Sequence, residues 1–111
     1  MRRLDSHHLH PFHCGDVICH RLYGYRGVVV AGDETCQAED AWYRMQTEGK
    51  PNPPTKLQPW YHVLVDGREH TTYVAEQNMQ LDPSGEPVQH PLLPEVFKTF
   101  FRGRYYREVL N

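Results

Sequence analysis

The sequence lacks the features that would assign it to a membrane, secretory or nucleotide-binding class. Its 111 residues contain no apolar run near the ~18 residues that indicate a membrane-spanning helix. Its glycines match neither of the nucleotide-binding fingerprints. The first residues are basic, but no apolar segment follows them, so we expect no secretory signal. We therefore expect a cytoplasmic protein that does not associate with membranes.

Cysteine is scarce, and the other candidate catalytic and metal-binding residues are poorly arranged. Cys14, Cys19 and Cys36 cannot all pair with one another, so we expect reduced thiols. His10 and His13 have the spacing of one pair of zinc ligands, but no second pair follows at a typical distance. No motif places a cysteine nucleophile on a strained turn or beside an oxyanion hole. We expect no metal, no cofactor and no enzymatic activity.

Lysine is also scarce, and the formal net charge of the chain is −2. Nonspecific binding to nucleic acids comes mainly from lysine and arginine neutralising phosphates, so this balance argues against a strongly phosphate-binding protein. It is still compatible with a local basic face. The 39% hydrophobic and 23% charged content is typical of a globular fold. We expect a flexible, histidine-rich lead-in at 1–11 and a single domain at 12–111.

Short segments rich in β-branched and aromatic residues predict antiparallel strands at 17–21, 25–31, 60–66 and 70–75. The turn at Tyr23-Gly24-Tyr25 joins the first two segments, and Asp66-Gly67 joins the last two, which predicts two hairpins. Gly27 predicts a bulge or a strong bend. Residues 76–81 suggest a single helical turn, and the tail at 104–110 suggests a short edge strand.

Two segments have helical spacing instead. In 38–48, four apolar residues recur along one helical stripe: Ala38, Ala41, Trp42 and Met45. A last helix is expected to begin at Pro94 and end at Gly103, with its phenylalanines at 97, 100 and 101 on one face. The sequence therefore predicts a mainly β fold. We expect a small antiparallel curled sheet or open barrel of four to five strands with two short helices.

Aromatic and basic residues gather around the two predicted hairpins. The candidate partner-binding residues are Arg21, Tyr23, Tyr25, Arg26, Trp60, Tyr61, His62 and Arg68. Rings stack on bases or insert between them, and arginine contacts phosphates or guanine edges. The same residue types are enriched at protein–protein interfaces. The residues by themselves leave nucleic acid and protein open as partners.

Several segments occur in an order that resembles one family. They are HRLYGYRGVVV, DETC before the first helix, QPWYHVLVD, YVAEQNM, and HP before the last helix. In this order they resemble the YccV-like domain, the hemimethylated DNA-binding domain of HspQ-type heat-shock proteins, which also occurs within some F-box proteins. The resemblance runs from about Phe12 to Tyr106.

The resemblance implies a small β fold with SH3-like barrel character and two kinds of non-catalytic function. One is binding to double-stranded DNA that is methylated on only one strand. The alternative is a protein-interaction role in the heat-shock response, as an adaptor or enhancer of Clp-type ATP-dependent proteolysis. The Clp-type protease or its substrates would then be the partner, and a homo-oligomer is the assembly that the resemblance suggests.

Overall fold

The computed structural model describes residues 12–110 and contains a five-stranded antiparallel sheet. Its strands are β1 (Val17–His20), β2 (Arg26–Asp33), β3 (Trp60–Val65), β4 (Thr71–Ala75) and β5 (Met79–Leu81). They are hydrogen-bonded in the order β4-β3-β2-β1-β5, so β4 and β5 form open edges and the barrel does not close. This arrangement confirms the predicted fold class and both predicted hairpins. The lead-in at 1–11 lies outside the described residues.

Two glycines and one bulge shape the first half of the sheet. Gly24, at φ 77°, completes the turn after β1, where its amide donates to the His20 carbonyl at 2.9 Å. Gly27 allows β2 and β3 to approach closely, because a Cβ there would lie 2.4 Å from Val63 Cγ1. The bulge lies between Val29 and Ala31, further along β2 than Gly27, where the sequence predicts a bulge or a strong bend.

The curled sheet has an apolar cluster on each face. The inner cluster contains Phe12, Ile18, Val29, Tyr61, Val63, Val74 and Met79. The outer cluster contains Val17, Val28, Leu64, Val88, Phe97 and Tyr105. Neighbouring residues of one strand therefore belong to different clusters, as the two-residue period of a strand requires. This pattern explains why the apolar runs in β1 to β3 are continuous.

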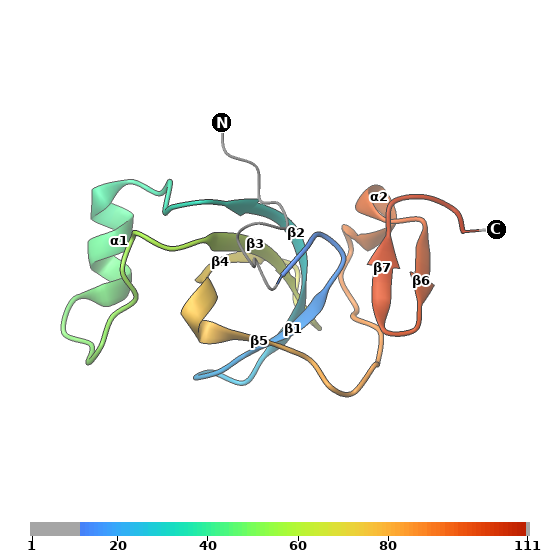
Figure 1. Cartoon of the computed structure of the whole chain (residues 1–111), viewed down its shortest axis with the longest axis horizontal. Coiled ribbons are helices and arrows are strands. Elements are labelled where there is room, and N and C mark those ends of the chain that lie inside the picture. The colour runs from blue at the N-terminus through green and yellow to red at the C-terminus, as the bar shows by residue number, and fades with distance from the viewer. Residues whose placement is uncertain (1–11, 111) are drawn as a thin grey trace.

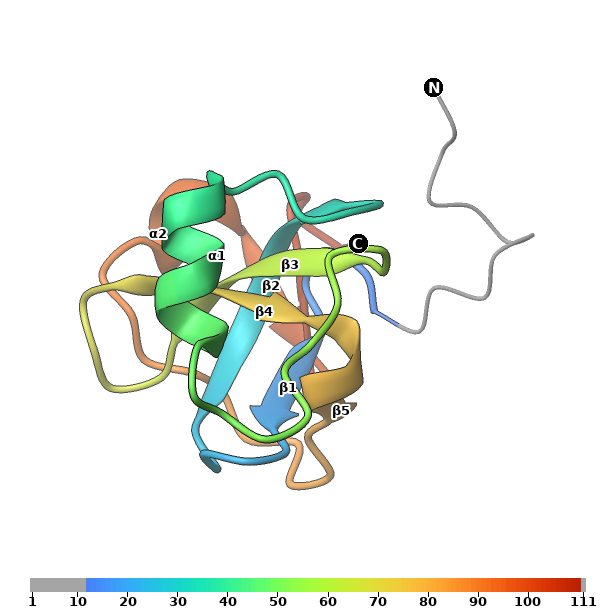
Figure 2. The same ribbon diagram turned by 90° about the vertical axis from the view of Figure 1, so that its left-hand side faces the viewer.

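Helix α1 (Asp40–Thr47) and the C-terminal unit lie at opposite ends of the sheet (Figure 1). The C-terminal unit consists of α2 (Leu93–Val96) and a hairpin of β6 (Thr99–Phe101) and β7 (Arg104–Tyr106). Figure 2, viewed from the α1 end, shows the strands crossing one another behind the helix. The molecule thus presents two different surfaces, one at each end.

The predicted last helix was largely wrong. Only α2 is helical, since the backbone is already extended at Phe97, with φ −120° and ψ 150°. The following residues form a hairpin whose turn contains Arg102 and Gly103, both at positive φ. The Phe100 ring turns inward to Tyr105, whereas Phe101 is 48% exposed. The phenylalanines therefore alternate as strand residues do, and strand propensity and a tight turn outweighed the helical spacing.

Two further predictions need correction. In α1, Met45 is 72% exposed, and the contacts with the sheet are made instead by the rings of Trp42 and Tyr43 against Trp60. Residues 76–81 form a helical turn only at Glu76–Asn78 and then continue as β5, which pairs with β1. The predicted tail strand exists as β7, but it pairs with β6 rather than with an edge of the five-stranded sheet.

Candidate functional site

A groove of about 670 Å³ lies between α1, the β3–β4 hairpin and the turn after β1. Five tyrosine and tryptophan rings line it: Tyr23, Tyr25, Trp42, Trp60 and Tyr73. We call it the aromatic groove. Its rings pack against one another, with centroids 5.8 Å apart for Trp42 and Tyr73 and 5.3 Å apart for Trp60 and Tyr73. Trp42, Trp60 and Tyr73 thus form an aromatic wall at one end, and Tyr23 and Tyr25 pack against His20 at the other, in a groove of the size that binding sites commonly have.

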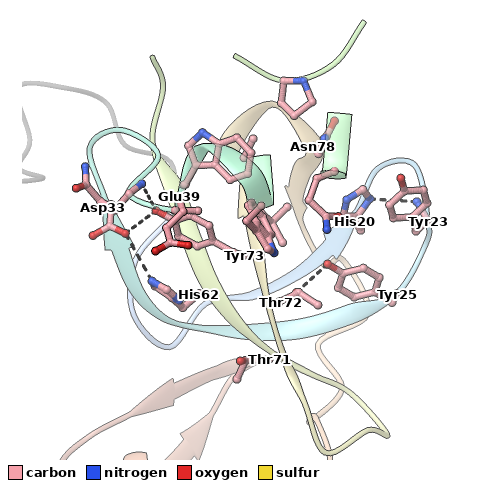
Figure 3. A pocket seen from close by; sticks show the side chains of 18 of the residues that line it. His20, Tyr23, Tyr25, Asp33, Glu39, His62, Thr71, Thr72, Tyr73 and Asn78 are labelled. Carbon is pink, nitrogen blue, oxygen red and sulfur yellow. Dashed lines mark hydrogen bonds and ion pairs between the residues drawn. The ribbon is translucent and has the colours of Figure 1, made fainter. Parts of the chain in front are cut away.

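One end of the aromatic groove is acidic. Asp33, Glu39 and His62 surround Tyr73 there (Figure 3). The Tyr73 hydroxyl donates to Asp33 Oδ2 at 2.6 Å and accepts from the Gln37 amide at 3.0 Å. Burial, together with the bond to Asp33, raises the pKa of Tyr73 above its ordinary value. Tyr73 is therefore a neutral donor that fixes the Asp33 carboxylate in place.

The opposite end of the aromatic groove is built on His20. Its Nδ1 accepts from the amides of Leu22 and Tyr23, both at 3.1 Å, which holds the turn after β1. The Tyr23 ring stacks on the His20 ring at 4.5 Å and remains 65% exposed. Burial lowers the pKa of His20, which favours the neutral ring that this turn requires. Lys50 lies at this end, with its Nζ 3.4 Å from the Tyr23 hydroxyl.

The structure brings four of the eight sequence-predicted residues together in the aromatic groove: Tyr23, Tyr25, Trp60 and His62. Trp60 is only 2% exposed and forms part of the floor. Tyr25 is half-buried, and its hydroxyl shares a hydrogen bond with Thr72 across the groove. His62 is exposed, and its Nε2 lies 3.5 Å from Asp33. Trp42 and Tyr73 were missed, although Tyr73 begins the YVAEQNM segment of the resemblance and Trp42 lies in the helix that follows DETC.

The other four sequence-predicted residues lie outside the aromatic groove, each in a different place. Arg26 pairs with Asp66 at 2.9 Å and Asp82 at 3.1 Å, so its cation is used to hold the sheet to the loop before α2. Tyr61 is 1% exposed and donates to Glu76 from within the inner cluster. Arg21 donates to the Met79 carbonyl beside β5. Arg68 is exposed in the turn between β3 and β4.

A second candidate surface is the C-terminal hairpin with its flanking residues, 97–107, which we call the basic hairpin. It contains four cations and no acidic residue: Lys98, Arg102, Arg104 and Arg107. Arg104 lies 3.5 Å from Asp16, and Arg107 contacts Cys14 Sγ at 3.4 Å. Among residues 12–110, the side chains of Lys98 and Arg102 form no ion pair. The hairpin itself therefore carries a net positive charge, with the acidic residues Glu95 and Glu108 in the flanking sequence.

The tip of the basic hairpin combines a cation with an exposed ring. The Arg102 guanidinium lies 5.0 Å from the Phe101 ring centroid. The segment FKTFFRGRYYR could have signalled this surface, because it has four cations and no carboxylate. The net charge of the whole chain gave no sign of this basic segment. The helix predicted there would also have placed the phenylalanine rings on one buried face.

The described residues contain neither a membrane-spanning helix nor a cluster of metal-ligating side chains. Across 12–110, no helix has the length and apolar content to cross a membrane. Within the same residues, no three histidine, cysteine or acidic side chains come together as metal ligands would. His7, His8 and His10 lie outside the described part of the chain.

Together, the fold and these two surfaces define a small β domain with two faces open to a partner. The family model described as "Hemimethylated DNA-binding protein YccV like" matches residues 10–104, and the chain belongs to this family. It is also similar to F-box only protein 21, at 29% identity over 107 residues for the protein of Mus musculus and 28% for that of Homo sapiens. The match covers 96% of this chain but only 16% of each relative.

Proposed function

We propose that this chain is a non-enzymatic module that binds double-stranded DNA through the basic hairpin. The observation that carries this function is the concentration of positive charge in 97–107, a segment without acidic residues in a chain whose net charge is −2. Phosphate contacts supply most of the affinity of a protein for DNA. Membership of a family described as hemimethylated DNA-binding supports the same partner.

The shape of the basic hairpin suits this role. The major groove of B-DNA admits a two-stranded β-ribbon, and β6 with β7 forms such a ribbon. Arg102 at its tip supplies a cation for a phosphate or a guanine edge, and Phe101 supplies an apolar surface for a base methyl group. Recognition of one methylated strand requires this combination of a positioning contact and an apolar contact.

The charge distribution also sets the expected strength of binding. Lys98, Arg102 and Arg107 are the exposed cations of the basic hairpin, and three phosphate contacts give a slope of about −3 for log K against log salt. Binding should therefore be moderate at low salt and weak at physiological salt. Arg21, Arg26 and Arg68, which are candidates from the sequence, do not enter this estimate because they lie outside the basic hairpin, and Arg26 is already paired.

The test is a titration of matched unmethylated, hemimethylated and fully methylated duplexes at two salt concentrations. Arg102→Gln should weaken binding to all three duplexes about three- to tenfold and reduce the salt slope by about 1. Arg44→Gln removes an exposed cation from α1 at the other end of the molecule and should change neither quantity. Arg68→Gln tests a residue that the sequence alone predicts to be a partner contact. Binding that is undetectable at low salt, or equal loss from Arg44→Gln and Arg102→Gln, would contradict the proposal.

A second candidate function is protein interaction, and the aromatic groove favours it. Its acidic end and exposed rings suit a peptide better than a phosphate backbone. Under this function the partner would be a segment of another protein, and the Clp-type protease or its substrates remain a prediction from the family resemblance. The heat-shock role, the homo-oligomer and the cytoplasmic location also remain predictions.

A further inference from the structure

Among the described residues, no lysine or arginine lines the acidic end of the aromatic groove, and the basic group there is the His62 imidazole, 3.5 Å from Asp33. Among the described residues that line the groove, Lys50 is the only lysine or arginine, and it lies at the opposite end beside Tyr23. Within residues 12–110, no lysine or arginine lies over the rings of Trp42, Trp60 or Tyr73. The rings and carboxylates at this end are therefore available to an external group.

The carboxylates there are only partly neutralised. Asp33 accepts from Tyr73, but the Glu39 side chain does not cap α1, although Glu39 is its N-cap residue. The N-terminus of a helix carries about +0.5 charge, which is less than the charge of the two carboxylates, so this end of the groove stays acidic. A ring face carries negative potential as well, and Trp is the strongest of the rings. Both features attract a cation to the same place.

The shape of the groove indicates what kind of molecule carries this cation. All five residues of β4 line the groove, although neighbours in a strand point to opposite faces of a sheet. The groove therefore follows the edge of β4, which is the outer strand of the sheet and has no strand beside it in the described chain. The backbone groups of an edge strand can pair with an extended peptide.

Resting on the second function above, we propose that the aromatic groove binds an extended peptide segment through one lysine or arginine side chain. The peptide lies along the edge of β4, and its cation sits against Trp42 and Tyr73 between Asp33 and Glu39. Lys50 at the far end disfavours a second cation there, so the groove selects a peptide with a single cation at the acidic end. This assignment gives the missed residues Trp42 and Tyr73 a role distinct from that of the basic hairpin.

The test compares two extended serine–valine peptides that differ at one central position, lysine in one and norleucine in the other. Trp42 and Trp60 are the only tryptophans of the chain and both line the groove, so intrinsic fluorescence reports binding directly. The lysine peptide should bind about tenfold more tightly, the difference expected from a partly desolvated cation on an aromatic face beside carboxylates.

Two matched variants locate the cation. Glu39→Gln should weaken the lysine peptide about three- to fivefold and leave the norleucine peptide unchanged. Glu95→Gln removes one exposed acid from α2 at the other end and should affect neither peptide. Trp42→Leu keeps apolar volume but removes the ring, and it should abolish the preference for lysine over norleucine, measured by calorimetry with circular dichroism as a check of folding.

The outcomes separate the cation from the groove. Equal binding of the two peptides would overturn the role of the cation while leaving peptide binding intact. Absence of any peptide binding would overturn this inference together with the second function, and DNA binding by the basic hairpin would be unaffected. Displacement of the lysine peptide by duplex DNA would assign the aromatic groove to DNA and overturn the proposal.

Discussion

The two ends of the molecule hold their aromatic residues in opposite ways. At the α1 end, the rings of Trp42 and Tyr73 are only half-buried and line a groove that contains two carboxylates. At the C-terminal end, Phe97 and Tyr105 are 5% and 7% exposed, and the charge around them is positive. One end thus keeps several rings open beside carboxylates, whereas the other buries Phe97 and Tyr105, exposes Phe101 at its tip and carries exposed cations.

This difference shows that aromatic content and basic content mark different sites in this protein. The sequence places rings and arginines together around the first hairpin, which favours one mixed surface. The structure separates them, because the Arg26 cation is used internally and the cations of the basic hairpin lie beyond α2. A phosphate-binding surface and a peptide-binding groove can therefore coexist in a chain of small net charge.

The largest expected effect tests whether the two ends differ in their contribution to stability. Phe97→Ala removes a buried ring from the outer cluster and should lower the free energy of unfolding by about 3–4 kcal/mol. Trp42→Ala removes a half-buried ring and should lower it by about 1–2 kcal/mol. Urea denaturation of the two variants measures both values. Equal losses would mean that the α1 end is as much a part of the core as the C-terminal end.

A smaller effect is expected at Arg26, and it distinguishes a structural cation from a binding one. Arg26→Gln leaves Asp82, whose side chain is 7% exposed, without its ion-pair partner. The free energy of unfolding should fall by about 2 kcal/mol. The affinity for duplex DNA, measured well below the melting temperature, should stay within about twofold of wild type. A large loss of affinity with unchanged stability would restore the sequence-based assignment of Arg26 as a contact.

The smallest expected effect is a pH dependence of the turn that His20 holds at one end of the aromatic groove. Burial lowers the pKa of His20 in the folded state, so the unfolded chain binds the proton more readily. The stability contributed by neutral His20 is fully present above its unfolded pKa of about 6.5 and is lost as pH falls from that value towards the lower folded pKa. Between about pH 7 and pH 5, amide exchange should therefore accelerate at Leu22 and Tyr23, which donate to His20.

The matched control for this pH effect is at the other end of the molecule. The Val88 amide donates to the Tyr105 hydroxyl, so its exchange should change less over the same range. His20→Asn should reduce the pH dependence at Leu22 and Tyr23. An identical pH response in the wild type and in this variant would assign the effect to another group.

The sequence was sufficient wherever a local pattern determined the structure. Alternation with a glycine turn predicted β1 with β2 and β3 with β4, and both hairpins form with their expected partners. Helical spacing succeeded at 40–47 but failed after Val96, because the i, i+3, i+4 spacing of Phe97, Phe100 and Phe101 covers too short a segment to exclude a strand hairpin. β5 was missed because three residues carry no readable period, and only its pairing with β1 defines it.

The candidate site was predictable only in part for the same reason. Tyr23 and Tyr61 look alike in sequence, yet one is 65% exposed and the other 1% exposed. Their environments depend on Lys50, Glu76 and other residues that are distant along the chain. Trp42 was read as a core residue of a helical stripe, whereas its ring faces the aromatic groove.

The sequence by itself determined the β architecture, the two hairpins and the family, since strand alternation, glycine turns and ordered motifs are local properties of the chain. The tertiary structure alone decided which rings stay open and which cations stay free. Arg26 shows why: its partner Asp82 is 56 positions away, and only folding brings the two charges within 3.1 Å. Burial and charge pairing are properties of contacts, and contacts between distant residues exist only in the fold.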